Sequence, residues 1–235
     1  MKKGKIYGVS LGPGDPDLIT VKGLRLLQTV DRIYYPGSVT EEGTTTSYSL
    51  PILKAYDLDE NKLTGMFLKM SDNRKDAQQT YSNTFQQMLA DYQNGLHVAF
   101  VSEGDISFYS TFSYLLTHIQ QHQLEVEIVA GVPSFLLGAA EHQVPLALLT
   151  EKIIILPRMS NTLQLQQYLS DFETVVLIKV RSILQEIALV IQQQTVTLCY
   201  CEHLGTTRQF ISTSLDEILK REIPYFSLLI LKKKI

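Results

Sequence analysis

Residues 5–20, KIYGVSLGPGDPDLIT, join a short β-prone run directly to a turn that is rich in glycine and proline. Residues 5–10 are the predicted strand, and residues 11–16 have the composition of a tight turn. Thr20 can cap the helix that follows. The apolar positions of this helix recur at helical spacing: Val21, Leu24, Leu27 and Val30. Residues 31–36 return to strand character, so the stretch predicts a βαβ unit with a right-handed crossover and a parallel sheet.

The alternation of strands and helices continues through the first half of the chain. Residues 76–94 form the clearest predicted helix, and residues 97–102 and 126–130 are strands that are apolar throughout. Each of these strands ends in a glycine turn, Glu103-Gly104-Asp105 and Gly131-Val132-Pro133-Ser134 respectively. Apolar strands predict a sheet that helices cover on both faces. Ligands of open α/β sheets bind at the edge where such turns lie.

The pattern of predicted strands and helices changes in the second half of the chain, and we place the boundary near residue 148. Strands are predicted at residues 152–157, 174–180, 195–202, 209–213 and 225–231, and helices at residues 162–170, 183–193 and 215–221. Two of these strands follow one another without a helix, so part of this sheet is predicted to be antiparallel. We therefore expect an α/β protein of two domains, residues 1–148 with a mostly parallel sheet and residues 149–235 with a mixed sheet.

Composition restricts the class of protein. The 235 residues carry 21 Lys and Arg against 24 Asp and Glu, a net charge of −3, and 45% of them are hydrophobic. This balance argues against disorder and against a nucleic-acid partner, which needs a basic surface. The longest apolar runs fall far short of the ~20 residues that span a bilayer, so no membrane association is expected. Glycine and proline interrupt the apolar start too early for a signal peptide, and only two cysteines occur, so we expect a cytoplasmic protein.

The first glycine turn can be interpreted in two ways. Gly8, Gly12 and Gly14 have the spacing G-x-x-x-G-x-G, which is neither a dinucleotide fingerprint nor a P-loop. The glycines could simply supply positive φ angles to a βα turn. They could equally form a ligand loop, because glycine lets a ligand approach the backbone closely.

Residues 8–20, GVSLGPGDPDLIT, resemble the N-terminal motif of the tetrapyrrole methylases, a family that uses S-adenosylmethionine to methylate precursors of cobalamin and sirohaem. Residues 101–110, VSEGDISFYS, are similar to the family's G-D-P-x-x-Y loop. Residues 127–135, EIVAGVPSF, are similar to its P-G-V-S-S segment. Ile106 stands where the family usually has proline, and residues 130–133 read AGVP instead of PGVS. Both departures alter loop backbone and remove no functional group.

Within the family, the chain looks most like the enzymes that methylate C-20 of precorrin-2 or of its cobalt form, cobalt-factor II. Residues 34–38, 109–111 and 224–228 carry this likeness. Uroporphyrinogen methylation, diphthine synthesis and ribosomal RNA 2′-O-methylation remain alternatives within the family, although the absence of a basic stripe disfavours RNA. A non-catalytic regulator that binds a tetrapyrrole or a nucleotide is the alternative from another class.

The resemblance implies that S-adenosylmethionine lies in the cleft between the two domains and leaves as S-adenosylhomocysteine. The residues that correspond to cofactor contacts are Pro13, Gly104, Asp105, Phe108, Ser134, Phe135 and Lys179, the last through its main chain. Asp105 could accept hydrogen bonds from ribose or amino groups, or could instead cap a helix. A cationic sulfonium needs alignment more than an acid or a base, so no catalytic residue is assigned. The family is commonly dimeric, so we expect a homodimer.

The carboxylates of a tetrapyrrole require local cations in this acidic chain. Candidates near predicted strand ends are Lys69, Arg74, Lys75, Arg158 and Arg181, and solvated surface charge is the alternative for each. His118 and His122 are four residues apart but have no evident third ligand, so no metal is expected. Cys199 and Cys201 fall on one face of a strand, which favours packing in the core.

Overall fold

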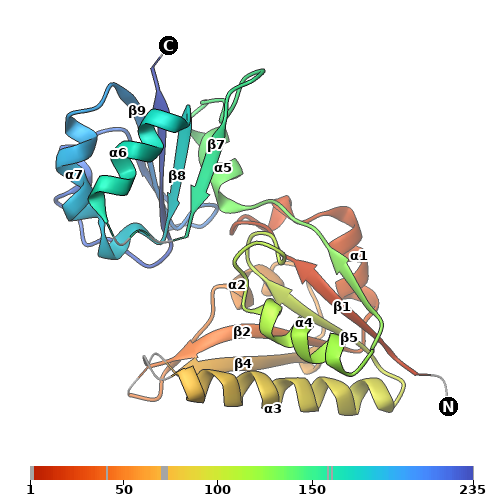
Figure 1. Cartoon of the computed structure of the whole chain (residues 1–235). Coiled ribbons are helices and arrows are strands. Elements are labelled where there is room, and N and C mark those ends of the chain that lie inside the picture. Colours follow the sequence, from red (N-terminus) through yellow and green to blue (C-terminus); the bar gives the residue numbers. More distant parts are fainter. Residues whose placement is uncertain (1–2, 41, 70–73, 158, 160, 235) are drawn as a thin grey trace. The chain divides into compact units, whose positions relative to one another are not determined.

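The computed structural model describes residues 3–40, 42–69, 74–157, 159 and 161–234. The chain divides into two compact units, Met1–Pro133 and Ser134–Ile235, and each contains one sheet with helices on both faces (Figure 1). The expected α/β fold of two domains is confirmed.

The first unit follows the predicted βαβ pattern. Its elements are β1 (Lys5–Ser10), α1 (Val21–Thr29), β2 (Arg32–Val39), β3 (Thr45–Thr46), α2 (Ser49–Lys54), β4 (Leu63–Lys69), α3 (Arg74–Gln93), β5 (His97–Ser102), α4 (Phe112–Gln121) and β6 (Val126–Val129), with short 3-10 turns at Pro16–Leu18 and Glu60–Lys62. The strand order is β3-β2-β5-β1-β6, and β4 also pairs with β2. Every described pairing is parallel except that of β2 with β3, as expected for the first domain.

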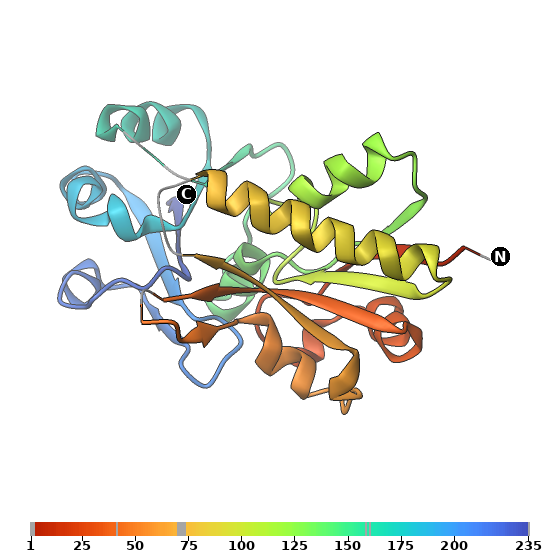
Figure 2. The ribbon, with the colours of Figure 1, turned by 90° about the horizontal axis from the view of Figure 1, so that it is seen from below.

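Two apolar layers cover the first sheet because its central strands are apolar on both faces. On β5, Val98 and Phe100 pack in the layer under α3 and α4. Ala99 and Val101 point the other way and pack in the layer under α1 and α2. Figure 2 shows α3 lying across one face of this sheet.

An ion-paired carboxylate links β6 to β1 and α1. Glu127 accepts from Lys5 Nζ at 2.7 Å and from Lys22 Nζ at 2.6 Å. Hydrogen bonds from the two ammonium groups lower the pKa of Glu127 to about 2 from its ordinary 4.5.

This shift predicts a pH dependence of stability. A carboxyl group whose pKa is depressed by folding stabilises the fold above its unfolded pKa and loses that contribution as the pH falls toward the folded pKa. We therefore expect Glu127 to add to the free energy of unfolding above about pH 4.5 and to lose this contribution progressively as the pH falls to about 2 and below. Glu127→Gln should unfold at a lower denaturant concentration than the wild type above about pH 4.5. The difference between the two midpoints should become smaller as the pH is lowered toward 2. A constant gap would contradict the assignment.

The second unit begins with a helix and continues with a mixed sheet. Its elements are α5 (Ser134–Glu141), β7 (Ile153–Leu156), α6 (Thr162–Asp171), β8 (Thr174–Ile178), α7 (Leu184–Gln192), β9 (Val196–Glu202), β10 (Phe210–Ser212), α8 (Leu215–Ile218) and β11 (Ser227–Lys233), with a 3-10 turn at Val180–Ser182. The strand order is β10-β9-β11-β8-β7. Among the described strands of this second sheet, only β7 and β8 pair in parallel, so the predicted mixed sheet is confirmed.

Helix α5 packs on the second sheet, although the sequence places it before the predicted boundary at residue 148. A Cβ added to Gly138 would lie 3.1 Å from Cys201 Sγ, so helix and strand are in close contact. Ala139 belongs to the same apolar cluster as Cys199 and Leu228. Alternation along the chain cannot reveal which sheet a helix covers, and the division observed lies between Pro133 and Ser134. Both cysteines are free and buried in this cluster, as predicted.

None of the helices in the described part of the chain is long and apolar enough to cross a membrane.

Candidate functional site

Three glycine loops follow directly after the carboxyl ends of neighbouring parallel strands. Ser10 and Ser102, the last residues of β1 and β5, are paired in register, and β6 runs on the other side of β1. The first two loops bond to each other through Gly12 and Gly104: the Gly12 N–H donates to the Gly104 carbonyl at 3.2 Å, and the Gly104 N–H donates back at 2.6 Å. Both glycines have positive φ angles, +81° and +65°. The three turns therefore meet at one edge, as expected.

The hydroxyl group of Ser10 joins all three strand ends. Its side chain is fully buried, and Oγ donates to the Val129 carbonyl of β6 at 2.8 Å. The same oxygen accepts the N–H of Ile106, in the loop after β5, at 2.8 Å. Ser10 was not among the site residues expected from the sequence. A small hydroxyl residue at the end of a buried strand, just before a glycine turn, is the signal that could have identified it.

Ile106 explains one departure from the family motif. Proline has no N–H, so the family's usual residue could not donate to Ser10 Oγ at this position. Ile106 restores this donor, and its side chain is buried in the first apolar layer. The departure therefore adds a hydrogen bond beside the group of three glycine turns, residues 11–16, 103–105 and 131–134, here called the loop assembly.

Asp105 links the second loop to the third. Its Oδ2 accepts the N–H of Gly131 at 2.7 Å, and its Oδ1 accepts the N–H of Ser107 at 2.9 Å and the Ser107 hydroxyl. Burial raises the pKa of this carboxyl, but the hydrogen bonds from Ser107 and Gly131 outweigh it and hold the pKa below its ordinary value. Helix α4 has Thr111 at its cap position, so the helix-cap alternative for Asp105 is wrong.

Gly131 is required where the loops approach most closely. A Cβ atom at this position would lie 2.3 Å from Ser10 Cβ and 2.9 Å from the Gly104 carbonyl oxygen. Beside Gly104 the space is open, because an added Cβ would meet only Pro133 Cα, at 3.8 Å. The assembly is thus tightly packed inside and accessible along the Gly104 backbone.

The other predicted residues of the first unit lie in the same loops. Pro13 is buried next to Gly12. Phe108 bonds through its N–H to the Asp105 carbonyl at 3.1 Å and packs edge-on against Tyr109, with 4.6 Å between ring centroids. Tyr109 is half exposed and has a φ of +52°, which is rare for an aromatic residue and typical of functional loops. Pro13, Gly104, Asp105 and Phe108 are therefore brought together.

Ser134, Phe135 and Lys179 belong to the second unit. Ser134 and Phe135 begin α5, and Phe135 packs against the apolar cluster under that helix. Lys179 follows β8 with a φ of +58°, and its N–H donates to the Ser227 carbonyl at 3.0 Å. Because that donor is used, the carbonyl is the main-chain group with which Lys179 could contact a cofactor.

The predicted substrate cations are exposed where the structure describes them. Lys69 ends β4, and Lys75 lies in the first turn of α3. Arg181 follows β8, and its Nη2 lies 4.0 Å from Glu222 Oε1. Arg158 and the side chain of Arg74 lie outside the described residues. Exposure fits substrate contact and solvated surface charge equally.

A partly buried acid, Glu103, adjoins the loop assembly. Glu103 Oε1 accepts the hydroxyl of Ser49 at 2.6 Å, at the start of α2. Burial raises the pKa of Glu103, so its protonated form is favoured more than that of an ordinary glutamate. From the sequence, Glu103 was expected only as part of a turn. Its contact fixes α2 against the end of β5.

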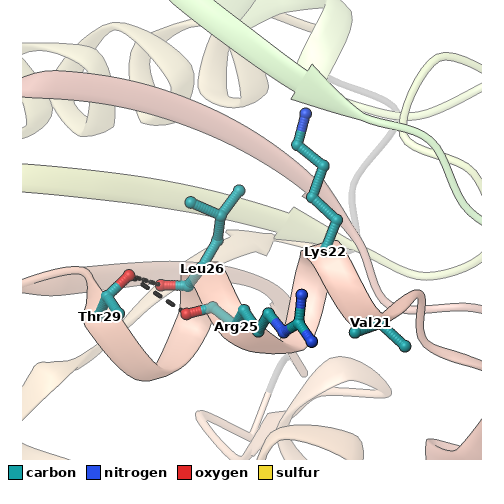
Figure 3. Close-up of a pocket in the computed structure, with 5 residues that line it drawn as sticks. All are labelled: Val21, Lys22, Arg25, Leu26 and Thr29. Atoms are coloured by element: carbon teal, nitrogen blue, oxygen red, sulfur yellow. Dashed lines mark hydrogen bonds between the residues drawn. The ribbon is translucent and has the colours of Figure 1, made fainter.

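Two other features do not add to this site. A depression of about 630 Å³ lies along α1, lined by Val21, Lys22, Arg25, Leu26 and Thr29 (Figure 3). None of the seven predicted cofactor residues lines it. His118 and His122 both contact the Phe85 ring, at centroid distances of 5.2 and 4.7 Å, and no metal-ligating cluster of three His, Cys, Asp or Glu residues occurs within the described ranges.

The fold and this loop assembly define a two-domain α/β protein with ligand loops at the carboxyl edge of a parallel sheet. The sequence profile of the tetrapyrrole (corrin/porphyrin) methylases matches residues 5–219. The chain belongs to this family.

Alignments with individual relatives cover most of the chain. It is 31% identical to a protein of Methanocaldococcus jannaschii named probable cobalt-precorrin-2 C(20)-methyltransferase, over 79% of this chain and 76% of that protein. It is 28% identical to cobalt-precorrin-2 C(20)-methyltransferase of Salmonella typhimurium, over 98% and 97% of the two chains. It is 29% identical to precorrin-2 C(20)-methyltransferase of a Sinorhizobium species, over 97% and 94%.

Solved structures share the fold. A cobalt precorrin-4 methyltransferase superimposes with a TM-score of 0.74 at 19% identity, covering 97% of this chain and 94% of that one. The uroporphyrin-III C-methyltransferase of Thermus thermophilus, solved as a complex with S-adenosylhomocysteine, has a TM-score of 0.67 at 17% identity, covering 97% of both chains.

Proposed function

We propose that this chain is the S-adenosylmethionine-dependent methyltransferase that acts on C-20 of precorrin-2, or of its cobalt form cobalt-factor II, in cobalamin biosynthesis. The hydrogen-bonded assembly of three glycine loops carries the proposal, because it is the ligand-binding feature of this fold. The names of the relatives that match nearly the whole chain support the choice of substrate and position.

The residues present fit the cofactor. S-adenosylmethionine supplies a methyl group on a cationic sulfonium. Pro13, Gly104, Asp105 and Phe108 of the first unit, with Ser134, Phe135 and Lys179 of the second, would hold it. The open space beside Gly104 lets a ligand approach the backbone, and Asp105 keeps acceptor capacity beyond its three internal hydrogen bonds.

These residues would act chiefly by alignment. Methyl transfer would form a carbon–carbon bond at the ring carbon and break the bond between the methyl carbon and the sulfonium sulfur, so that S-adenosylhomocysteine leaves, and the proton of the ring carbon would pass to solvent. Holding two reactants in near-attack geometry can lower the barrier by about 7–11 kcal/mol. The rigid loop assembly suits such a role, since its three loops are fixed to one another by Ser10 and Asp105. No acid or base is assigned.

Turnover of defined substrates tests the function. The protein is incubated with labelled S-adenosylmethionine and precorrin-2, with and without cobalt, and uroporphyrinogen III serves as the competing substrate. Label transferred to C-20 of either precorrin-2 form is the expected result, and the cobalt requirement identifies the preferred form. Transfer to uroporphyrinogen alone would favour the alternative methylase. Binding without turnover would favour a regulator.

Asp105→Ala is expected to weaken S-adenosylhomocysteine binding about 10-fold or more while the fold survives. The variant removes the bond between the second and third loops, and a hydrogen bond to a charged group contributes about 1.5–3 kcal/mol. Isothermal titration calorimetry measures the affinity, and circular dichroism checks the fold. Asp59→Ala is the matched control, because Asp59 accepts from Asn61 in a similar turn without joining the glycine loops. Unchanged affinity in Asp105→Ala would rule out this role.

We also propose that the enzyme is a cytoplasmic homodimer. The two free, buried cysteines support a reducing compartment. The dimer rests on the resemblance to the family, and light scattering on the purified protein tests it. A mass near 26.6 kDa, that of one chain, would exclude the dimer.

A further inference from the structure

One edge of the second sheet carries exposed aromatic side chains beside a lysine. Strand β11 is antiparallel to both β8 and β9, so the carboxyl ends of those two strands meet the start of β11. Leu228 pairs with Ile178, and Ser227 pairs with Glu202. The residues at this edge, here called the aromatic edge, are Lys179, His203, Tyr225 and Phe226.

The aromatic rings are accessible and arranged around each other. Tyr225 is 45% exposed and Phe226 is 39% exposed, unusual for neighbouring large aromatics. Their rings are perpendicular, with 5.2 Å between centroids. The ammonium of Lys179 lies 5.5 Å from the centroid of the Tyr225 ring. Ring faces and a cation are thus presented together.

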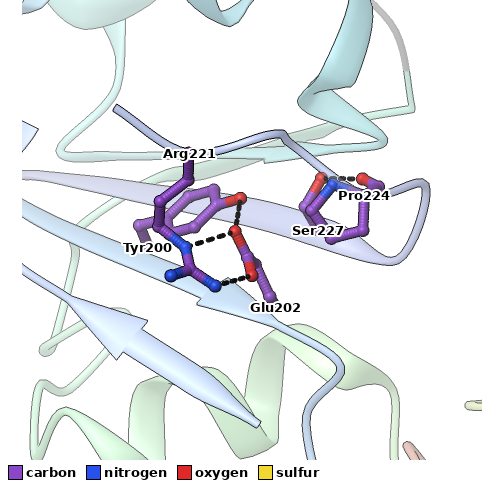
Figure 4. A network of polar contacts seen from close by, with 5 residues as sticks. All are labelled: Tyr200, Glu202, Arg221, Pro224 and Ser227. Carbon is purple, nitrogen blue, oxygen red and sulfur yellow. Dashed lines mark hydrogen bonds and ion pairs between the residues drawn. The ribbon is translucent and has the colours of Figure 1, made fainter. Parts of the chain in front are cut away.

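Backbone hydrogen bonds hold the aromatic edge in place. The N–H of His203 donates to the Phe226 carbonyl at 3.0 Å, and that of Lys179 donates to the Ser227 carbonyl at 3.0 Å. Ser227 Oγ donates to the Pro224 carbonyl at 2.8 Å (Figure 4). Lys179 and His203 both have positive φ angles, +58° and +45°. Strained residues held this firmly are found at binding sites more often than elsewhere.

The charge at this edge suits an anionic ligand. Among the described residues, no carboxylate lies within 4.0 Å of Lys179 Nζ. Arg208 is exposed and close enough to His203 to help lower its pKa, behind the larger effect of burial. The one acidic side chain at the end of β9, Glu202, is already paired with Arg221. Lys179 therefore places a positive charge at the edge, and the carboxylate of Glu202 is neutralised by Arg221.

We propose that the aromatic edge is a subsite for the tetrapyrrole, with the Tyr225 ring against the flat face of the macrocycle and the Lys179 ammonium on one of its rim carboxylates. The inference rests on the proposed function and names residues that would give it substrate specificity. A π-face beside a cation matches a flat, carboxylate-bearing ring. This subsite also gives a role to residues 224–228, none of which is among the proposed cofactor contacts.

Binding of uroporphyrin III, a stable porphyrin with carboxylates on its rim, tests this subsite by fluorescence titration. Tyr225→Ala should weaken porphyrin binding about 10-fold, within the range for losing one stacking partner. Tyr225→Phe should retain the wild-type affinity. Lys179→Asn, chosen because asparagine tolerates a positive φ, should weaken binding about 3-fold or more and reduce its dependence on salt.

Control variants separate the subsite from general effects. Tyr114→Ala removes a tyrosine of the first unit that is somewhat more exposed than Tyr225, and Lys220→Ala removes an exposed lysine outside the aromatic edge. Both should bind porphyrin as the wild type does. Tyr225→Ala should keep its affinity for S-adenosylhomocysteine within about 2-fold, because its ring would contact only the tetrapyrrole. A parallel loss of both ligands would indicate a structural role and overturn the proposal.

Three further outcomes would overturn it. The first is a wild type that does not bind uroporphyrin III. The second is porphyrin affinity unchanged in both Tyr225→Ala and Lys179→Asn. The third is loss of self-association in Tyr225→Ala with porphyrin affinity unchanged, which would identify the edge as a contact between copies of the chain. If the proposed function alone fails, precorrin-2 is not methylated but the effect of Tyr225 on porphyrin binding remains.

Discussion

Gly131→Ala is expected to lower the affinity for S-adenosylhomocysteine about 100-fold, the largest effect on binding that we predict. The added methyl group would lie 2.3 Å from Ser10 Cβ and 2.9 Å from the Gly104 carbonyl oxygen. Ser10 is fully buried and bonded on two sides, and the Gly104 carbonyl already accepts from Gly12. Neither neighbour can move without breaking a hydrogen bond of the assembly.

The size of this predicted loss follows from the atoms that the added methyl group must displace. Overpacking a well-filled site costs about 1–3 kcal/mol, and 2.7 kcal/mol corresponds to about 100-fold in affinity. The displacement also stretches the bond from the Gly131 N–H to Asp105, so the third loop separates from the second. The loss should therefore fall mainly on ligand binding and less on the stability of the remaining sheet.

Gly43→Ala is the matched control. Gly43 also has a positive φ, +84°, but an added Cβ there would meet no atom within 4 Å. It should cost about 1 kcal/mol of stability through backbone strain and leave ligand affinity unchanged. Calorimetry with S-adenosylhomocysteine gives the affinity of both variants, and urea unfolding gives their stability. Equal affinities in the two variants would show that the close approach at Gly131 does not shape the site.

Local patterns were sufficient to predict the sheets. The apolar strands at residues 97–102 and 126–130 alternate with helices, and a parallel sheet follows from that order because each crossover must return on one side. The positions of the glycine turns followed as well, since every turn after a parallel strand lies at the same edge. The motif likeness then assigned the chain to its family.

Contacts between distant residues could not be predicted in this way. Ser10 bonds to Val129 and Ile106, and both partners lie about a hundred residues away along the chain. Asp105 was expected to meet a ligand or cap a helix; it does not cap α4, and its bond to Gly131 in another loop could not be predicted. Helix α5 gives no sign in its own sequence of which sheet it covers. These features depend on tertiary packing, which composition and periodicity do not encode.

Arg221→Ala is expected to lower the free energy of unfolding by about 2–3 kcal/mol at pH 7.5. Glu202 is only 4% exposed, and its carboxylate accepts from Arg221 Nε at 3.2 Å and Nη2 at 2.8 Å and from the Tyr200 hydroxyl at 2.7 Å (Figure 4). Removing one partner of a buried pair leaves an uncompensated charge, which typically costs 3–5 kcal/mol. The cost should be smaller here, because the Arg221 side chain is 39% exposed and water can partly replace it.

The pH dependence of this loss identifies its cause. Burial raises the pKa of Glu202, but hydrogen bonds from Arg221 and Tyr200 outweigh it, so the pKa lies below 4.5 in the wild type. A depressed pKa stabilises the fold above about pH 4.5 and loses that contribution as the pH falls. Without Arg221 burial dominates and the pKa rises above 4.5. In the variant, the ionised Glu202 would then destabilise the fold at pH 7.5, and this cost disappears as the carboxyl group takes up a proton. The variant should therefore regain stability relative to the wild type as the pH is lowered from 7.5 to 5.

Urea unfolding at pH 7.5 and pH 5 measures the stability of the variant and of the wild type. Circular dichroism follows the unfolding, because the chain has no tryptophan whose fluorescence could report it. Arg181→Ala is the control, because its ion pair with Glu222 is long and exposed and should contribute less than about 0.5 kcal/mol. The double variant Glu202→Gln with Arg221→Met should recover part of the loss, as methionine can still cover the Phe210 ring, which Arg221 overlies at 3.7 Å. A loss that is independent of pH and persists in the double variant would mean that packing on Phe210, and not the buried charge, makes Arg221 important.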